Sequence, residues 1–232
     1  MTMNNYSNKK RGLQAVIFDM DGLLFDTESL LVRFWHEAGL VYGYDITPEH
    51  VISIRSLARV RAIEVFKGYF GSEFDYEAVR CERIRLMNEY ISENGLVKKK
   101  GVDEILRFLK ENNIKMALST ATDTKRTKVY LQKSGIMDYF DEIVCGDMVS
   151  VGKPEPDIYL LAVKKLGCKA DECIALEDSP NGLISAKRAG CIPIMVPDLS
   201  EPNEELLSNI YSREDNLNDV IELIKKDFIL IR

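Results

Sequence analysis

The sequence of 232 residues is poor in the side chains that hold zinc. It contains two histidines, His36 and His50, and five cysteines, which are odd in number, scattered, and nowhere arranged as Cys-x-x-Cys. These counts argue against a zinc site. We expect the thiols to be reduced and buried, as is usual for a cytoplasmic protein.

The chain also lacks features that direct a protein to a membrane or to nucleic acid. Residues 1–11 are polar and basic without the apolar stretch of a signal peptide, and no run approaches the roughly 20 apolar residues of a membrane span. The net charge of −6 argues against a nucleic-acid-binding surface. There is no internal repeat and no low-complexity segment. We therefore expect no membrane partner, no nucleic acid, and a cytoplasmic location.

The apolar residues that are present form short runs separated by amphipathic segments. The hydrophobic fraction of 46% and the charged fraction of 29% are ordinary for a globular protein. Alternation of strand and helix is typical of an α/β fold with a doubly wound parallel sheet and a Rossmann-like core. We expect a terminal helix over residues 217–230. The predicted strands are residues 15–18, 115–118, 142–145, 173–176 and 192–196, and the predicted helices are residues 103–112, 124–134, 156–166 and 182–189.

One long segment interrupts this alternation. Residues 28–96 contain charged amphipathic stretches at 29–37, 58–66 and 76–90 and no convincing strand. A helical insertion explains this pattern most simply. We predict a helical cap domain over residues 28–96, inserted into a catalytic core made of residues 1–27 and 97–232.

Two carboxylates stand where the first predicted strand ends. Asp19 and Asp21 follow residues 15–18 directly, and burying unpaired charge is costly. In open α/β sheets, ligands bind beyond the carboxyl ends of the strands. Asp19 and Asp21 can converge there on a cation or share a proton. The alternative is that they form a turn before Gly22.

Polar residues follow the next two predicted strands as well. After residues 115–118, the hydroxyl of Thr120 and the free backbone N–H groups around Ala121 could bind phosphate oxygens, although the Ser and Thr residues here and Asp123 also suit a helix N-cap. Lys153, before Pro154, could extend its ammonium into the crevice as a charge for phosphate. The alternative for Lys153 is a solvated surface position.

The fourth strand end carries adjacent carboxylates. Glu177 and Asp178 follow residues 173–176 and provide hard oxygen ligands suited to Mg²⁺, with a turn and N-cap as the alternative. Each strand end is ambiguous by itself. Because all four share one sheet edge, together they indicate a site of chemical function rather than four separate turns, caps or surface positions.

In this order the motifs resemble the haloacid dehalogenase-like superfamily. Residues 18–28, 152–157 and 176–182 are similar to its β-phosphoglucomutase-like subgroup, which has a helical cap where residues 28–96 lie. The resemblance covers residues 14–196, and its motifs are highly specific together. The cap matches only in length and helicity.

The resemblance implies a mechanism. Asp19 would be the nucleophile and form an aspartyl-phosphate, while Asp21 would act as general acid and then as general base. Mg²⁺ would lie between the Asp19 carboxylate, the Asp21 backbone carbonyl and the Asp178 carboxylate, with Glu177 as a further or water-mediated partner. The transferring phosphoryl group would be held by Thr120, rather than Ser119, together with Ala121 and Lys153.

Departures from the subgroup bear on the reaction. Leu31 stands where the mutase has a histidine. Lys100-Gly101 replaces the Pro-Gly that is usual where the cap returns to the core. The usual glycine-containing, arginine-bearing substrate loop of the cap is only weakly recognisable in residues 50–56. These departures favour hydrolysis of a small phosphorylated metabolite by a Mg²⁺-dependent phosphatase. A sugar phosphomutase is the first alternative, and a non-catalytic binding protein on the same fold is the second.

Other charged residues of the cap segment are left open. Arg55, Arg59 and Arg61 could contact the substrate, but a solvated helix face is the favoured interpretation, and His36 and His50 are expected at the surface or with satisfied hydrogen bonds. We expect a monomer, with a dimer as the alternative.

Overall fold

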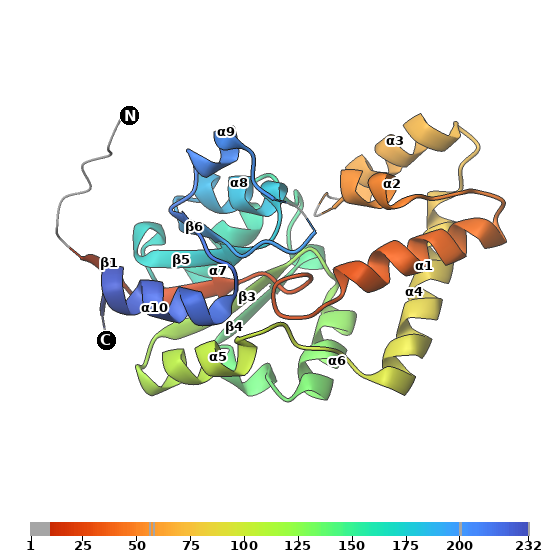
Figure 1. Cartoon of the computed structure of the whole chain (residues 1–232). Coiled ribbons are helices and arrows are strands. Elements are labelled where there is room, and N and C mark those ends of the chain that lie inside the picture. Colours follow the sequence, from red (N-terminus) through yellow and green to blue (C-terminus); the bar gives the residue numbers. More distant parts are fainter. Residues whose placement is uncertain (1–9, 56, 58, 200, 232) are drawn as a thin grey trace.

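A twisted parallel sheet forms the centre of the molecule. The computed structural model describes residues 10–55, 57, 59–199 and 201–231. Within them, six strands pair in the order β4-β3-β2-β5-β6-β7, and every pairing is parallel (Figure 1). The predicted doubly wound sheet is confirmed. The strands are β2 Ala15–Phe18, β3 Lys115–Thr120, β4 Glu142–Cys145, β5 Cys173–Glu177, β6 Ile192–Met195 and β7 Ser212–Arg213.

Helices cover both faces of this sheet, because the side chains of a strand alternate between its two faces. In β2, Val16 and Phe18 join one hydrophobic cluster and Ala15 and Ile17 join the other. A strand that is apolar at every position is the expected result. The first cluster is completed by α5 (Val102–Glu111), α6 (Thr124–Ser134) and α10 (Leu217–Asp227), and the second by α7 (Asp157–Leu166) and α8 (Pro180–Arg188).

The order of the strands creates a crevice at one edge. From β2 the chain passes to β3 and β4 on one side, then returns to β5 and β6 on the other, so β2 lies between β3 and β5. The reversal of strand order beside β2 is the point where open α/β sheets bind ligands. Residues that follow these strands therefore meet in one place.

Four further helices lie beyond this end of the sheet (Figure 1): α1 Glu28–Val41, α2 Pro48–Ser53, α3 Arg59–Phe70 and α4 Tyr76–Asn94. They share a cluster of their own in which the rings of Trp35 and Phe66 lie 5.0 Å apart. Phe34 and Met87, by contrast, pack into the cluster of the main sheet. This arrangement fits the predicted cap, whose boundaries at residues 28 and 96 stay a prediction.

The prediction for the C-terminal segment is wrong at its end. The helix predicted over residues 217–230 stops at Asp227, and Phe228–Leu230 form strand β8, which pairs in parallel with β1 (Arg11–Leu13). Phe228 is buried and Ile229 is exposed, which is the two-residue period of a strand.

Several short elements were not predicted. They are β1, β7, β8, α2, α9 (Glu204–Leu207) and the 3₁₀ helices η1 Met137–Tyr139, η2 Gly146–Met148 and η3 Ala170–Glu172. The helix predicted over residues 58–66 begins at Arg59, and residue 58 lies outside the described residues. In the described part of the chain, no helix combines the length and apolar character of a membrane span.

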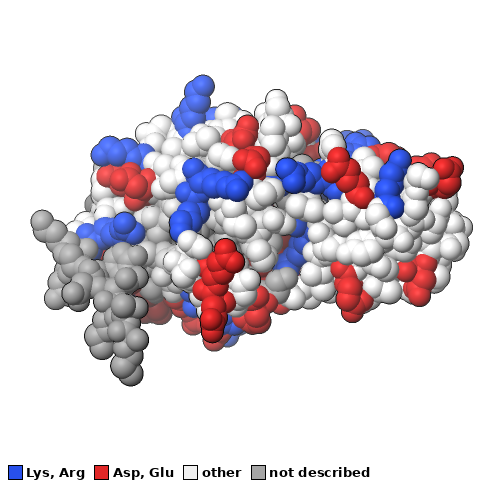
Figure 2. Space-filling model, turned by 90° about the horizontal axis from the view of Figure 1, so that it is seen from above, with Lys and Arg blue, Asp and Glu red and all other residues white. Residues whose placement is uncertain are grey.

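Acidic and basic side chains are mixed on the surface. On the face that Figure 2 shows, several Lys and Arg side chains lie next to one another across the centre, with Asp and Glu beside them.

Among the cysteines, burial predicts different reactivity. Cys81 is exposed, whereas Cys145, Cys173 and Cys191 are buried, and burial raises the pKa of Cys191 to about 12. A thiol-reactive dye at pH 8 should therefore modify Cys81 first. The rate is followed by absorbance, and Cys81→Ser should remove the fast phase. Equal rates for all thiols in the folded protein would contradict this packing.

Candidate active site

Asp19 stands at the centre of the crevice. It follows β2 directly, and its backbone N–H donates to the carbonyl of Leu176 in the neighbouring strand β5 at 3.0 Å. Only 5% of the residue is exposed. The strand pairing thus fixes the backbone of Asp19 at the sheet edge and holds its carboxylate at the base of the crevice.

Lys153 meets Asp19 there. Its ammonium is buried and donates to Asp19 Oδ1 and Glu177 Oε1, each at 2.5 Å, and to the carbonyl of Ser119 at 3.1 Å. Tyr159 donates to the same Glu177 oxygen at 2.5 Å. The solvated position considered for Lys153 is wrong. One cation links the ends of three strands.

The charges of this group shift one another's protonation. Burial raises the pKa of Asp19 well above its usual range, against the opposing effect of Lys153, and the nearby Glu177 carboxylate raises it further. For Lys153, burial disfavours the charge, but the carboxylates of Asp19 and Glu177 outweigh it and raise the pKa of the ammonium. Lys153 therefore stays charged.

Asp21 has a different environment from Asp19. Its two carboxylate oxygens accept hydrogen bonds from the hydroxyls of Thr27 and Thr122, both at 2.7 Å. Arg126 in turn donates to the Thr122 hydroxyl at 3.2 Å. These hydrogen bonds thus hold the Asp21 side chain in place. Unlike Asp19, Asp21 is not bonded to the Lys153 ammonium.

Two of the predicted phosphate-binding residues stand where β3 ends, Thr120 as its last residue and Ala121 directly after it. Thr120 and Ala121 both line the same cavity as Asp19. The Thr120 hydroxyl accepts from the backbone N–H of Thr122 at 3.0 Å, which shapes the loop. The N-cap of α6 is Asp123, whose side chain accepts from the N–H of Arg126 at 3.0 Å. Asp123, rather than Thr120, therefore serves as the N-cap.

Asp19, Glu177 and Asp178 form a group of carboxylates that fits a metal ion. One oxygen of each lies within 4.8 Å of the others, and all three residues are buried. Asp178 Oδ1 is buried without a hydrogen-bond partner among the described residues. Hard oxygen ligands of this kind suit Mg²⁺. The predicted role of the Asp21 backbone carbonyl stays a prediction.

Gly22 allows this close packing. Its φ of +84° favours glycine, and a Cβ at this position would collide with the Asp178 carboxylate. The turn considered before Gly22 lies instead at residues 22–24, after both aspartates, and Gly22 packs there against the Asp178 carboxylate.

Arg55 enters the site from the segment after α2. It forms an ion pair with Asp178, and its Nε lies 3.3 Å from Glu28 Oε2. The favoured interpretation of Arg55 as a solvated residue is wrong, because tertiary packing buries it; Arg59 and Arg61 are exposed as expected. His50 is satisfied as expected, since its Nδ1 accepts from the backbone of Thr47 at 3.1 Å.

Glu28 was not singled out from the sequence. It is buried beside Arg55, and burial raises its pKa to about 8, with Arg55 opposing the shift. In the sequence, a glutamate at the start of a helix looks like any carboxylate that stabilises the first helical turn, whether or not it also lines a site. Only the tertiary structure shows that Glu28 lies beside Arg55 in the cavity.

A cavity of about 170 Å³ joins the sheet edge to the inserted helices. Its volume suits a small molecule, below the usual size of sites for drug-sized ligands. Residues from both parts of the chain line it: Asp19, Asp21, Glu28, Leu31, Trp35, Val51, Ile54, Arg55, Leu57, Arg59, Tyr76, Arg80, Arg83, Met87, Thr120, Ala121, Thr122, Arg126 and Tyr130.

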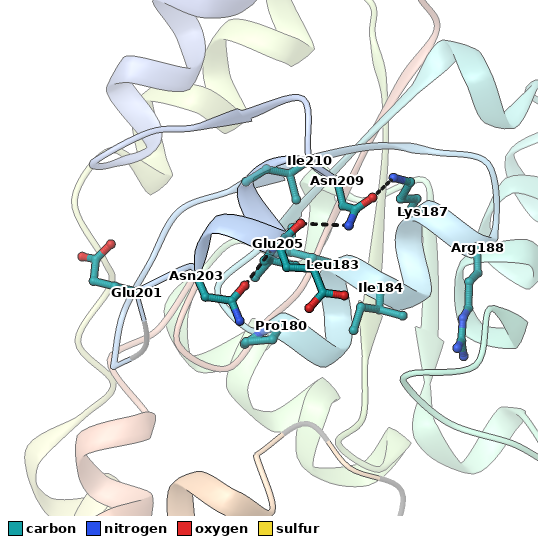
Figure 3. Close-up of a pocket in the computed structure, with 11 residues that line it drawn as sticks. Pro180, Leu183, Ile184, Lys187, Arg188, Glu201, Asn203, Glu205, Asn209 and Ile210 are labelled. Carbon is teal, nitrogen blue, oxygen red and sulfur yellow. Dashed lines mark hydrogen bonds between the residues drawn. The ribbon is translucent and has the colours of Figure 1, made fainter. Parts of the chain in front are cut away.

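A second, larger cavity of about 470 Å³ lies between α8 and α9. Figure 3 shows Leu183, Ile184 and Ile210 on its lining, with Lys187 donating to Asn209. None of the predicted site residues lines it.

Residues 16–196 match the haloacid dehalogenase-like hydrolase family. The chain belongs to this family. The predicted membership is confirmed, and so is the predicted hydrolase class of the enzyme.

Three similar proteins represent its relatives. The chain is 34% identical to a phosphorylated carbohydrates phosphatase of Thermotoga maritima over 77% of its own length and 82% of the relative. It is 29% identical to hexitol phosphatase B of Escherichia coli O157:H7, over 94% and 98% of the two chains. The structure resembles that of a β-phosphoglucomutase from Clostridium difficile, with a TM-score of 0.78, 27% identity, and coverage of 93% and 96%.

The geometry of the Lys153 ammonium predicts a large effect on stability. Lys153→Met would leave Asp19 and Glu177 buried without their cation, which costs about 3–5 kcal/mol of unfolding free energy. Urea unfolding without added metal, followed by circular dichroism, measures the change. The exposed Lys165, paired with Glu142, is the matched control, and Lys165→Met should cost less than about 1 kcal/mol. Equal losses for the two variants would contradict this account.

Proposed function

We propose that this protein is a Mg²⁺-dependent phosphatase that hydrolyses a small phosphomonoester, such as a sugar phosphate, through an aspartyl-phosphate on Asp19. The observation that carries the proposal is the buried Asp19 carboxylate, 2.5 Å from the Lys153 ammonium and lining a cavity. A dianionic phosphate approaches a carboxylate only where positive charge offsets the repulsion, and Lys153 supplies part of it.

In the first step, an oxygen of Asp19 attacks the phosphorus atom, and the bond from phosphorus to the ester oxygen breaks. Asp21 gives a proton to that leaving oxygen. The hydroxyls of Thr27 and Thr122 hold the Asp21 side chain in place for this transfer. Thr120, Ala121 and Lys153 bind the phosphoryl oxygens.

In the second step, water attacks the aspartyl-phosphate. Asp21, now a carboxylate, removes a proton from the water, and the bond between phosphorus and the Asp19 oxygen breaks. Inorganic phosphate leaves and both aspartates return to their starting state. Asp19 and Asp21 therefore have separate roles, in keeping with their separate hydrogen-bond partners.

Asp19, Asp178 and Glu177 would hold Mg²⁺, together with the Asp21 carbonyl. When bound, the ion supplies positive charge to the phosphoryl oxygens. Asp178 Oδ1, which has no hydrogen-bond partner among the described residues, and the clustered carboxylates support this assignment.

Hydrolysis is favoured over isomerisation by the residue at the mutase histidine position. Leu31 lines the cavity there, and its side chain has no group that can donate or accept a proton. The relatives named as a phosphorylated carbohydrates phosphatase and a hexitol phosphatase support the same substrate class. We further infer a monomeric, cytoplasmic enzyme.

A sugar phosphomutase is the alternative, supported by the likeness to the β-phosphoglucomutase structure. Conversion of β-glucose 1-phosphate to glucose 6-phosphate, measured with a bisphosphate activator present, separates the two reactions. Isomerisation faster than release of inorganic phosphate would favour the mutase.

Substitution of the two aspartates tests the mechanism. Asp19→Asn should abolish phosphate release from p-nitrophenyl phosphate, because the amide is not a nucleophile for phosphorus. Asp21→Asn should lower the rate by about 10²–10⁴-fold through loss of proton transfer. Circular dichroism controls for folding. Turnover by a folded Asp19→Asn variant would disprove the nucleophile, and an unchanged rate for Asp21→Asn would remove its proton-transfer role.

Removal of the metal tests the carboxylate cluster. Dialysis against EDTA should lower phosphate release roughly a hundredfold or more, because a bound ion stabilises the transition state by several kcal/mol. Added Mg²⁺ should restore the rate, while Ca²⁺, which prefers more ligands at longer distances, should restore less. Full activity in EDTA would refute the metal requirement.

A further inference from the structure

Arg83, on α4, places a buried positive charge at the cavity. The residue is 5% exposed, and no carboxylate of the described chain lies within ion-pair distance of it. Its Nη1 lies 3.8 Å from Met87 Sδ, its guanidinium lies 5.3 Å from the Trp35 ring centre, and its buried Nε has no hydrogen-bond partner among the described residues. Buried charges are ordinarily paired, so this one calls for a partner from outside the chain.

Two more arginines add to the positive charge. Burial, then repulsion from Arg126 and Arg80, lowers the pKa of Arg83 to about 9, so it remains charged at neutral pH. Both neighbours also line the cavity. Arg126 lies 3.7 Å from Asp123, and Arg80 has no ion pair within the described residues.

Tyr130 provides a further donor at the same place. Its hydroxyl is buried, lines the cavity and has no hydrogen-bond partner in the described part of the chain. Burial, with the nearby Asp21, raises the pKa of Tyr130 to about 12, which keeps the hydroxyl protonated. Guanidinium groups have no acceptor, so the ligand that satisfies Arg83 and Tyr130 together must offer acceptor oxygens and negative charge.

The carboxylates of the cavity do not fill this need. Each has its own donors: Lys153 for Asp19, Thr27 and Thr122 for Asp21, and Arg55 for Glu28. The arginines on α4 and α6 are therefore not required to balance them. The positive charge is in excess on the wall formed by the inserted helix α4 and by α6, while the predicted phosphoryl site lies on the sheet edge.

We propose that Arg83, with Arg80, Arg126 and Tyr130, binds a second anionic group of the substrate. The preferred substrate is then a small phosphomonoester that carries a further phosphate or carboxylate. The proposal rests on the proposed phosphatase function, whose substrate class it narrows. A cavity of about 170 Å³ suits a compact metabolite.

Matched substrate pairs test the proposal. Phosphate release is measured for fructose bisphosphate against fructose monophosphate, and for phosphoglycerate against glycerol phosphate. Because a hydrogen bond to a charged group contributes about 1.5–3 kcal/mol, kcat/KM should be about tenfold or more higher for the doubly anionic member of at least one pair. The pair that shows the preference identifies phosphate or carboxylate as the second group. Absence of a preference in both pairs would overturn the proposal.

Arg83→Met should bring that preference to within about threefold of unity. Arg85→Met is the matched control, since Arg85 lies on the same helix but is exposed and paired with Glu82 and Glu89, and it should keep the preference. An equal loss of kcat/KM for both members of a pair in Arg83→Met would contradict a subsite for the second anion.

Unfolding separates ligand binding from a structural role. Because Arg83→Met removes an unpaired buried charge, the ligand-free variant should unfold at the same or a higher urea concentration than the wild type. Unfolding at a clearly lower concentration would assign Arg83 to the fold and overturn the proposal.

Binding to Asp19→Asn distinguishes failure of this proposal from failure of the proposed function. Calorimetry with the same compounds needs no turnover, and the doubly anionic member should bind about tenfold more tightly. Equal affinities would overturn the anionic subsite even if the wild type is a phosphatase. Tighter binding without turnover by the wild type would instead uphold the subsite and reject the phosphatase.

Discussion

The contact of the Lys153 ammonium with Asp19 and Glu177 is the interaction on which the site depends. One buried cation joins residues that follow β2 and end β5, and it also binds the carbonyl of Ser119 in β3. Without it, two carboxylates would be buried at one sheet edge, which is strongly unfavourable. The hydrophobic core on both faces of the sheet brings the strand ends together. The ammonium offsets the unfavourable free energy of burying the two carboxylates there.

The remaining carboxylates are organised by different groups. Hydroxyls of Thr27 and Thr122 bind Asp21, whereas Arg55 pairs with Asp178 and lies beside Glu28. Different partners give chemically similar side chains different environments. This separation supports the proposal that Asp19 attacks phosphorus and Asp21 transfers the proton.

The inserted helices complete the site rather than merely cover it. Arg55 comes from the segment after α2, and Arg83 comes from α4, and both are buried against the crevice. Arg83 lacks a carboxylate partner in the described chain, so this part of the protein carries charge that its own fold does not balance. The proposed anion subsite therefore places part of the substrate selection in the inserted helices.

Much of the fold was predictable because its signals are local. Apolar runs and helix periodicity placed most strands and helices of the core. The strand at Phe228–Leu230 was missed because its pairing with β1 joins opposite ends of the chain. Such long-range pairing leaves little trace in a short segment.

The sequence by itself determined the parallel sheet, the four polar strand ends and the family, since strand period and motif spacing are properties of neighbouring residues. Tertiary structure alone decided which charges are buried and with which partners. Lys153, Arg55 and Arg83 resemble surface residues in sequence, because long cationic side chains are usually solvated. Their burial follows from packing between segments far apart in the chain, which no local pattern encodes.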